Sequence, residues 1–153
     1  MKIGAVGLGN RIAHVFHELS QINHEAKLVA YVDPLPIGKD YAEKHNFFPK
    51  KKYATLDEML ADEKLDLLMI GSPNHLHLDH IKTGLNAGVK IFAEKPIVVD
   101  ENQSFELAKL LGEFGQDQVL VGLVLRYSQH ARSVRDLINK NVLGNICLLY
   151  TSD

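Results

Sequence analysis

Three short segments carry residue types that bind or transform small molecules. The first is the turn Gly7-Leu8-Gly9-Asn10, and the others are Ser72-Pro73-Asn74-His75-Leu76-His77 and Glu94-Lys95-Pro96. Each follows a short apolar run that has the composition of a buried strand. Open α/β sheets bind their ligands at the carboxyl ends of parallel strands, so all three segments are candidates for one site. Taken alone, Glu94 and Lys95 are equally well explained as a surface ion pair.

The Gly7–Asn10 turn has the composition of a phosphate-binding turn. Its first glycine tolerates unusual dihedral angles, and its second lets the backbone approach a pyrophosphate. A helix starting near Asn10 or Arg11 would direct its free amides and positive dipole end at that anion. The third glycine of the usual fingerprint is replaced by Ile12, so we expect looser helix–strand packing, or packing through Ala13. An ordinary glycine turn in another α/β protein remains the alternative.

Asp33 follows the second expected strand, Lys27–Val32. An acidic residue some twenty positions after the glycines normally accepts hydrogen bonds from the adenosine ribose. Its charge would repel a 2′-phosphate, so we expect NAD rather than NADP, although Lys39 could offset the repulsion. The alternative is that Asp33 only opens the turn at Pro34.

The composition excludes several classes of protein. The chain has 153 residues and a formal net charge of −2, which predicts one main domain and no nucleic-acid partner. Lys50–Lys52 is the only basic cluster, and we interpret it as a solvated loop. We find no apolar run long enough to span a membrane, and no signal peptide. The chain has one cysteine, Cys147, so it cannot form an internal disulfide. We therefore expect a cytoplasmic protein with no membrane partner.

The order of apolar runs and helical patterns predicts an α/β fold: a Rossmann-type, doubly wound parallel sheet. Leu67–Ile70 is continuously apolar, as expected of a strand buried on both faces. The expected strands are Lys2–Val6, Lys27–Val32, Leu65–Ile70, Val89–Ala93 and Gln118–Leu125.

Helix ends are marked by recognisable capping residues. Thr55 and Glu58 have capping-box spacing, and Asp100 with Gln103 repeats it. Ser128 is the expected cap of a last helix that ends near Asn141, with Ala131, Val134 and Ile138 on one face. A glycine in Asn86-Ala87-Gly88 ends the helix that starts near His75.

Together with the glycine turn, the Pro73-Asn74 and Glu94-Lys95-Pro96 segments closely resemble the glucose–fructose oxidoreductase, inositol dehydrogenase and rhizopine-catabolism family of NAD(P)-dependent oxidoreductases. Arg126-Tyr127, followed by a helix and Gly144-Asn145-Ile146, looks like this family's crossing into its second domain. The resemblance extends from Lys2 to about Ile146.

The resemblance implies roles for individual residues. Lys95 would contact the substrate hydroxyl beside the nicotinamide, where an ammonium orients an alcohol and stabilises developing negative charge. Glu94 and the Ser72–Asn74 loop would line the nicotinamide–ribose side, and His77 would shape that loop. The expected cofactor-binding residues are therefore Gly7, Leu8, Gly9, Asn10, Arg11, Ile12, Asp33, Ser72, Pro73, Asn74, His77, Glu94, Lys95 and Arg126.

The other histidines suggest no metal site. His75, His77 and His80 do not share one helix face, and no cysteine lies nearby. We expect His80 on a helix surface. We expect four further histidines to be structural or solvated: His14, His17, His24 and His45.

In this family a second domain supplies the usual histidine base and the dimer surface, and we do not expect that machinery in this chain. We predict an NAD(P)-binding domain over residues 1–125, a crossing segment over 126–146, and only the first strand of a truncated α+β domain. Back-translation of Cys147–Asp153 resembles a sequencing-library adapter, so we expect this tail to be non-native; a genuine strand is the alternative. Homo-oligomers are expected only of the full-length protein.

The predicted function is an NAD-dependent dehydrogenase acting on a sugar, polyol or related hydroxyl compound, with the isolated fragment binding dinucleotide weakly and turning nothing over. Two alternatives remain open. One is a non-catalytic dinucleotide sensor, against which the intact Lys95 argues. The other is an NAD-dependent glycosidase, in which hydride transfer is transient.

Overall fold

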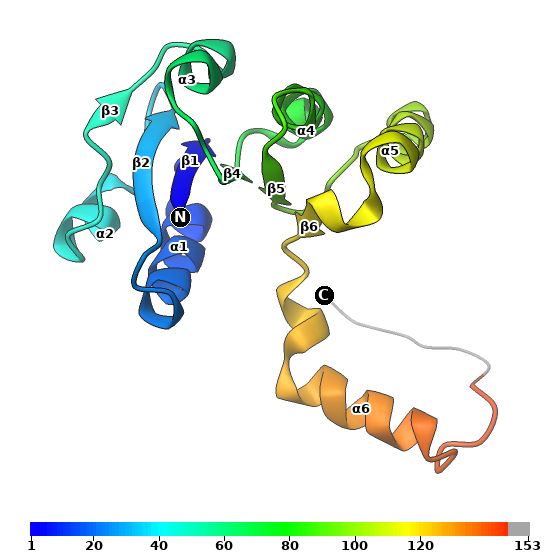
Figure 1. Ribbon diagram of the computed structural model, residues 1–153. Helices are drawn as coiled ribbons and strands as arrows, with labels where there is room; N and C mark the ends of the chain where they lie inside the picture. Colours follow the sequence, from blue (N-terminus) through cyan, green and yellow to red (C-terminus); the bar gives the residue numbers. More distant parts are fainter. Residues whose placement is uncertain (147–153) are drawn as a thin grey trace. The chain divides into compact units, whose positions relative to one another are not determined.

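The computed structural model describes residues 1–146 and divides the chain into two compact units, Met1–Gly122 and Leu123–Asp153. The first unit is a six-stranded parallel sheet covered by helices (Figure 1). Its strands are β1 (Lys2–Val6), β2 (Lys27–Val32), β3 (Lys51–Lys52), β4 (Leu67–Ile70), β5 (Lys90–Ala93) and β6 (Val119–Val121). Its helices are α1 (Asn10–Ile22), α2 (Lys39–Lys44), α3 (Leu56–Asp62), α4 (His77–Asn86) and α5 (Glu101–Phe114), with short 3₁₀ turns at Asn74–Leu76 and Gln116–Gln118.

The strand order β3-β2-β1-β4-β5-β6 confirms the doubly wound Rossmann-type sheet. The chain winds outward from β1 in one direction through β3, then returns to β4 on the other side of β1. The order therefore reverses between β1 and β4, and ligands of open α/β sheets bind in the crevice beyond that point.

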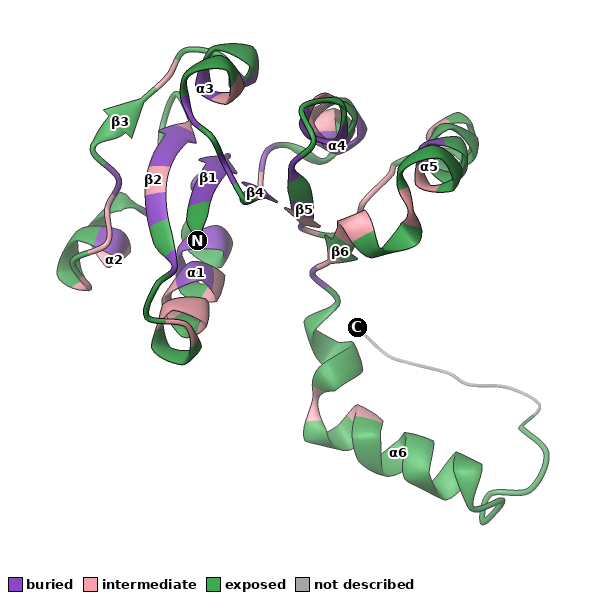
Figure 2. Cartoon of the chain, in the orientation of Figure 1, coloured by how far each residue is buried: buried purple, intermediate pink, exposed green. Residues whose placement is uncertain are grey.

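Two apolar clusters lie on opposite faces of the sheet. On one face, Ile3, Ala5 and Met69 pack with Ile12 and Phe16 of α1. On the other, inward residues of the strands pack with α3, α4 and α5; they include Leu68, Ile70, Ile91, Met59, Ile81 and Leu107. Strands buried on both sides have to be apolar throughout, which explains the unbroken Leu67–Ile70 run. Figure 2 shows the buried residues concentrated in these strands and inner helix faces.

The capping residues behave as predicted. Thr55 Oγ1 accepts from the Glu58 amide at 3.2 Å while Glu58 Oε2 accepts from the Thr55 amide at 3.3 Å, which completes a capping box. Asp100 Oδ1 accepts from the Gln103 amide at 2.8 Å. These caps satisfy amides that have no partner within the helix, and so fix where α3 and α5 begin.

Two strand predictions need correction. β3 was expected to be part of a solvated loop, but Lys51 and Lys52 pair in parallel with Ala30 and Tyr31 of β2. β6 ends at Val121, well before the expected Leu125, because the chain passes through Gly122 into a 3₁₀ turn over Val124–Tyr127.

The second unit consists of that 3₁₀ turn and α6 (Gln129–Asn139), whose cap is Ser128 Oγ accepting from the Ala131 amide at 3.2 Å. None of its described residues is buried, and the predicted apolar face of α6 is half-exposed at Val134 and Ile138.

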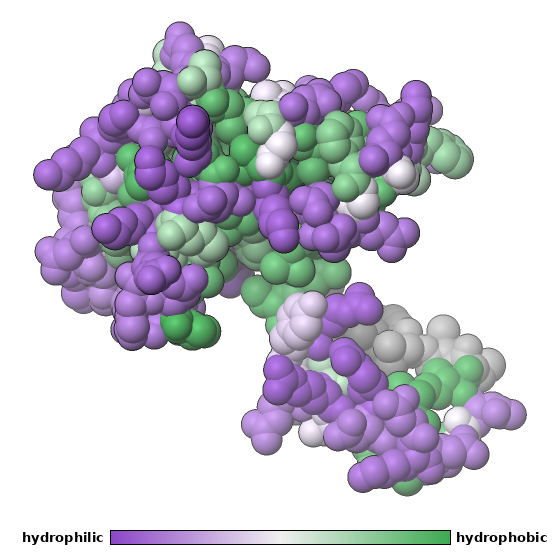
Figure 3. All heavy atoms as spheres, in the orientation of Figure 1, coloured by the Kyte–Doolittle hydropathy of each residue, from purple (hydrophilic) through white to green (hydrophobic). Residues whose placement is uncertain are grey.

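On the face that Figure 3 draws, hydrophilic side chains cover most of the outer surface and apolar ones show between them. The strand or adapter tail expected from residue 147 lies outside the described residues. Over residues 1–146, no helix is long and apolar enough to cross a membrane.

A third fingerprint glycine usually lets the helix approach its strand closely. Here a glycine that follows a neighbouring strand leaves the space instead. Ile12 is 1% exposed and Ala13 is fully buried, so both side chains pack between α1 and the sheet, and the expected packing through Ala13 is present. The space comes from Gly71 at the end of β4, where an added Cβ would lie 2.4 Å from Ile12 Cγ1 and 2.8 Å from the Gly7 carbonyl oxygen. A bulky residue on the helix is therefore matched by a missing side chain on the strand.

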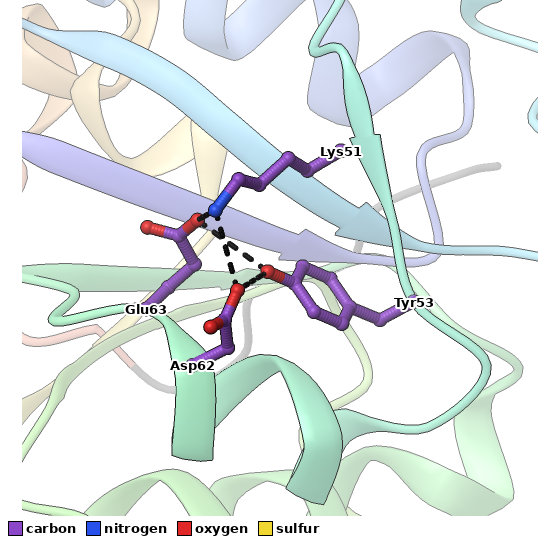
Figure 4. Close-up of polar contacts among 4 residues, drawn as sticks. All are labelled: Lys51, Tyr53, Asp62 and Glu63. Atoms are coloured by element: carbon purple, nitrogen blue, oxygen red, sulfur yellow. Dashed lines mark hydrogen bonds and ion pairs between the residues drawn. The ribbon is translucent and has the colours of Figure 1, made fainter.

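The edge strand β3 is anchored by an ion-pair cluster rather than by apolar contacts (Figure 4). Lys51 Nζ lies 2.6 Å from Glu63 Oε1 and 3.2 Å from Asp62 Oδ2. The Tyr53 hydroxyl donates to Asp62 Oδ2. Hydrogen bonds from Tyr53 and Lys51 lower the pKa of Asp62, and those to Glu63 and Asp62 raise the pKa of Lys51. The cluster joins β3 to the end of α3.

We predict that Lys51→Met lowers the urea midpoint of unfolding near neutral pH, whereas Lys52→Met at the exposed neighbouring position leaves it unchanged. The pKa of Asp62 is lowered from 3.8, so its contribution is present above about pH 4 and is lost as pH falls through the folded value. The pKa of Lys51 is raised from 10.5, so its contribution persists to alkaline pH, and on the acid side the two variants converge as the carboxylates are protonated. Equal midpoints for both variants at pH 7 would show that the cluster does not stabilise the fold.

Candidate functional site

A pocket of about 600 Å³ lies at the carboxyl ends of β1, β2 and β4, where the strand order reverses. Residues from the three loops after these strands line it, namely Val6, Gly7, Gly9, Val32, Asp33, Pro34, Leu35, Ile37, Gly71, Ser72, Pro73, Leu76 and His80. The structure thus brings together Gly7, Gly9, Asp33, Ser72 and Pro73 of the predicted site. This is the position at which an open α/β sheet binds a nucleotide.

The two glycines of the turn have different steric roles. Gly7 has a φ of +80°, and an added Cβ would lie 2.3 Å from the Ser72 amide nitrogen, so no other residue fits. Gly9 has an ordinary φ of −80°, and an added Cβ would meet no atom within 4 Å. The absent side chain at Gly9 therefore leaves open space at the pocket rather than relieving a clash within the protein.

The start of α1 lies beside that space, and the amides of its first turn have no partner within the helix. Gly9 is the N-cap of α1, and no side chain caps the helix. Its neighbours are arranged in two groups: Leu8 and Ile12 are buried in the core, whereas Asn10 and Arg11 are exposed and line a separate depression with His14. The backbone of this turn, rather than the side chains of residues 8–12, faces the pocket.

Asp33 fits both interpretations left open by its sequence. Its Oδ1 accepts from the Leu35 amide at 2.8 Å, which is the turn-forming hydrogen bond expected of an Asp-Pro segment. The residue also lines the pocket, together with exposed Leu35 and Ile37. Lys39 does not line it; its Nζ lies 3.5 Å from Glu43 Oε1 and 5.6 Å from the centroid of the Phe48 ring.

The loop after β4 is held by two histidines of α4. His77 is 1% exposed, and its ring nitrogens lie 2.7 Å from the Pro96 carbonyl oxygen and 2.8 Å from that of Ser72. His80 Nδ1 lies 2.9 Å from Ser72 Oγ. His80 lies on α4, as expected, at a half-buried position; it also lines the pocket, and burial lowers its pKa. Asn74 is exposed and begins the short turn before α4.

Glu94 and Lys95 follow β5 directly, beside the end of β4. The Glu94 amide donates to the Ile70 carbonyl at 2.9 Å, which fixes the start of this segment. Glu94 Oε1 is buried and has no hydrogen-bond partner among the described residues. Lys95 is exposed, and its bond to Pro96 is cis. The segment therefore offers one buried acceptor and one accessible ammonium, and the surface ion pair between them is not formed.

Arg126 lies in the second unit, in the 3₁₀ turn that ends at Tyr127. Its carbonyl oxygen accepts from Arg135 Nη2 at 3.3 Å, and its own side chain is exposed. The cofactor role of Arg126 stays a prediction.

Several pocket residues were missed at the level of sequence. Gly71, Leu35, Ile37, Leu76 and His80 all line the pocket. The sequence carried one signal for these residues, the glycine directly after the apolar Leu67–Ile70 run. It bears on the pocket because β4 pairs with β1, which the glycine turn follows. Gly38 is also tightly placed, since an added Cβ would lie 2.7 Å from the Gly9 carbonyl oxygen.

The histidines of α1 form a cluster with Tyr41 of α2 and with His45, which follows α2, and this cluster was not expected. His14 stacks on Tyr41 at 3.9 Å, and the centroids of the His17 and His45 rings are 4.1 Å apart. His17 Nδ1 lies 2.7 Å from the Tyr41 hydroxyl. Burial lowers the pKa of His45, with His17, Lys44 and His14 adding to the effect. Among residues 1–146, no group of three His, Cys, Asp or Glu side chains is placed to hold a metal ion.

Known proteins are similar to this chain in sequence and in fold. The model of a family described as "Oxidoreductase family, NAD-binding Rossmann fold" matches residues 1–123. Inositol 2-dehydrogenase of Rhizobium meliloti (strain 1021) is 29% identical over 95% of this chain and 43% of that protein. The 2,7-anhydro-N-acetylneuraminate hydratase of Mediterraneibacter gnavus is 27% identical over 88% of this chain and 36% of that protein.

Solved structures show the same fold. The crystal structure of scyllo-inositol dehydrogenase from Lactobacillus casei with bound NAD(H) and scyllo-inositol has a TM-score of 0.78 and 28% identity. That match covers 95% of this chain and 43% of the other, so the chain spans less than half the length of the relatives it matches. With a family model that covers most of its length, the chain belongs to this oxidoreductase family, as its glycine turn and Glu94-Lys95-Pro96 predicted, and carries its NAD-binding Rossmann fold.

Proposed function

We propose that this chain is the cofactor-binding part of a dehydrogenase that transfers hydride between a hydroxyl carbon of a sugar or polyol and NAD. The observation that carries the proposal is the pocket at the strand-order reversal, with open space at Gly9 and Asp33 at its rim. Its relatives include enzymes named inositol 2-dehydrogenase. The whole activity needs residues beyond this chain, because those relatives are more than twice as long.

The residues of the pocket fit a dinucleotide. The uncapped first turn of α1 supplies amides and a positive dipole end for a pyrophosphate, and the missing Cβ at Gly9 leaves room for it. Leu35 and Ile37 offer an apolar cover for an adenine ring. Asp33 would accept from the adenosine ribose through Oδ2, since Oδ1 is already bonded to the Leu35 amide.

The segment after β5 fits the reacting end. Bound NAD would supply the hydride acceptor. The buried, unpartnered Glu94 Oε1 would accept from a ribose hydroxyl on the nicotinamide side, which would remove its desolvation penalty. The exposed Lys95 ammonium would hold the substrate hydroxyl and stabilise the negative charge that develops as its proton leaves.

The two glycines provide a test of the pyrophosphate site. We expect Gly9→Ala to weaken NAD⁺ binding at least tenfold, because its methyl group fills the space at the pocket. The same variant should change the free energy of unfolding by less than about 1 kcal/mol. Gly7→Ala should instead lower stability by more than about 1 kcal/mol, since it combines a positive φ with a clash. NMR titration with NAD⁺ and urea unfolding measure the two quantities; unchanged affinity in Gly9→Ala would contradict this placement of the pyrophosphate.

Asp33 should decide between NAD and NADP. We expect Asp33→Asn to narrow the preference for NAD⁺ over NADP⁺ by about tenfold, because it removes the charge that repels a 2′-phosphate. Asp40→Asn, at an exposed position on α2, is the matched control. Dissociation constants for both dinucleotides give the ratio, and an equal ratio in wild type and Asp33→Asn would assign Asp33 to the turn alone.

Lys95 should affect turnover more than cofactor binding. In the protein with its downstream sequence, Lys95→Met is expected to lower kcat with myo-inositol and NAD⁺ at least a hundredfold and to change NAD⁺ affinity less than threefold. Lys109→Met, on the exposed face of α5, serves as the control. Tight NAD⁺ binding without turnover of any polyol would favour the sensor, and turnover of glycosides without net NADH would favour the glycosidase.

A further inference from the structure

Gly38 lies directly against the turn that forms the proposed pyrophosphate site. Its amide donates to the Leu8 carbonyl oxygen at 3.0 Å. An added Cβ would lie 2.7 Å from the Gly9 carbonyl oxygen and 2.9 Å from that of Leu8. Both neighbours are backbone atoms, which cannot rotate away as the end of a side chain can. The loop after β2 therefore meets the turn after β1 at a contact that leaves no room for a side chain.

The backbone conformation of Gly38 does not itself require a glycine. Its φ of −79° and ψ of −1° are those of the third residue of a common β-turn, a conformation that most residues adopt. What excludes a side chain is the contact with Gly9. The Gly9 carbonyl oxygen also accepts from the Ala13 amide at 3.0 Å, which is a first hydrogen bond of α1. A group added at Gly38 would therefore displace the start of α1.

The segment that ends at this contact, Asp33–Gly38, is held in shape by local hydrogen bonds; we call it the adenosine platform. Asp33 Oδ1 accepts from the Leu35 amide at 2.8 Å, and the Pro36 carbonyl oxygen accepts from the Lys39 amide at 3.0 Å. Its two prolines fix their own φ angles. The adenosine platform is thus preformed, and Gly38 docks it on the neighbouring turn.

The adenosine platform presents side chains to the pocket. Leu35 is 75% exposed and Ile37 is 64% exposed, although both are apolar, and both line the pocket with Asp33. Apolar side chains that are grouped at a pocket are typical of ligand contacts. Because their backbone is already fixed, a ligand that covers them loses little affinity to the ordering of the loop.

We propose that Gly38 is a positioning residue, which sets the spacing between the adenosine platform and the pyrophosphate turn and so fits the site to adenosine that carries a 5′-phosphate. The proposal rests on the proposed function, which places the ribose at Asp33 and the pyrophosphate at Gly9. These two groups are covalently joined in the ligand, so the two parts of the site have to keep one spacing. Gly38 acts through its neighbours and contacts neither group.

Adenosine and AMP separate this role from a general effect on the fold. Adenosine contacts only the platform side of the site, whereas AMP reaches from the platform to the turn. In Gly38→Ala, we expect the dissociation constant of AMP to rise about tenfold and that of adenosine to change less than about threefold. Gly112→Ala is the matched control, because an added Cβ there meets no atom within 4 Å. NMR titrations of the isotope-labelled chain measure all of these constants.

The wild-type protein provides a second measurement, which decides the question if Gly38→Ala does not fold. The Gly38 amide is bonded to the Leu8 carbonyl, so its hydrogen exchange reports how often the contact opens. A ligand that needs both parts of the site in place should hold the contact closed. We expect saturating AMP to slow this exchange about tenfold and adenosine to slow it less than about threefold.

NAD⁺ titrations distinguish the failure of this proposal from the failure of the proposed function. If neither NAD⁺ nor AMP binds the wild type, the proposed function is refuted, and the role of Gly38 with it. If both bind the wild type and Gly38→Ala equally well, the proposed function stands and the positioning role is refuted. Equal losses of adenosine and AMP affinity in Gly38→Ala would also overturn it, because they would assign Gly38 to the stability of the platform alone.

Discussion

The structure depends on the close approach of two turns, one after β1 and one after β4. An atom added at Gly7 would lie 2.3 Å from the Ser72 amide, and one added at Gly71 would lie 2.8 Å from the Gly7 carbonyl. These two strands are neighbours because the strand order reverses between them, so the backbone of one ligand loop lies directly against the other. Any side chain at either glycine would separate the loops, and with them the walls of the pocket.

That approach also explains why the chain lacks the third glycine of the fingerprint and still packs its first helix closely against the sheet. Ile12 stands where a third glycine usually allows a helix to approach its strand, and it is nevertheless fully buried. Gly71 provides the space from the opposite side, 2.4 Å from Ile12 if it carried a Cβ. A spacing rule within one loop cannot show such an exchange, because the two residues are 59 positions apart and meet only through the pairing of β1 with β4.

Features with local causes could be predicted from the sequence, and features that depend on contacts between distant segments could not. Strands, caps and the Gly7–Asn10 turn were predictable because their signals lie within a few residues of each other. The edge strand β3 was not, since two lysines carry no strand pattern and their pairing depends on the edge of β2 and on Asp62 and Glu63. The place of His80 in the pocket was missed for a related reason: it goes with a contact to Ser72, which helix periodicity does not encode.

The polar groups around the pocket fall into two classes, and the division bears on function. Ser72, His77 and the Oδ1 atom of Asp33 are hydrogen-bonded within the chain and hold the loops in place. Glu94 Oε1 has no partner among the described residues, and no side chain caps α1. A folded protein keeps a buried, unpartnered acceptor only at a cost of roughly 1–3 kcal/mol. A ligand with hydroxyl donors near Glu94 and an anionic group near α1 would satisfy both, and a dinucleotide has both groups in one molecule.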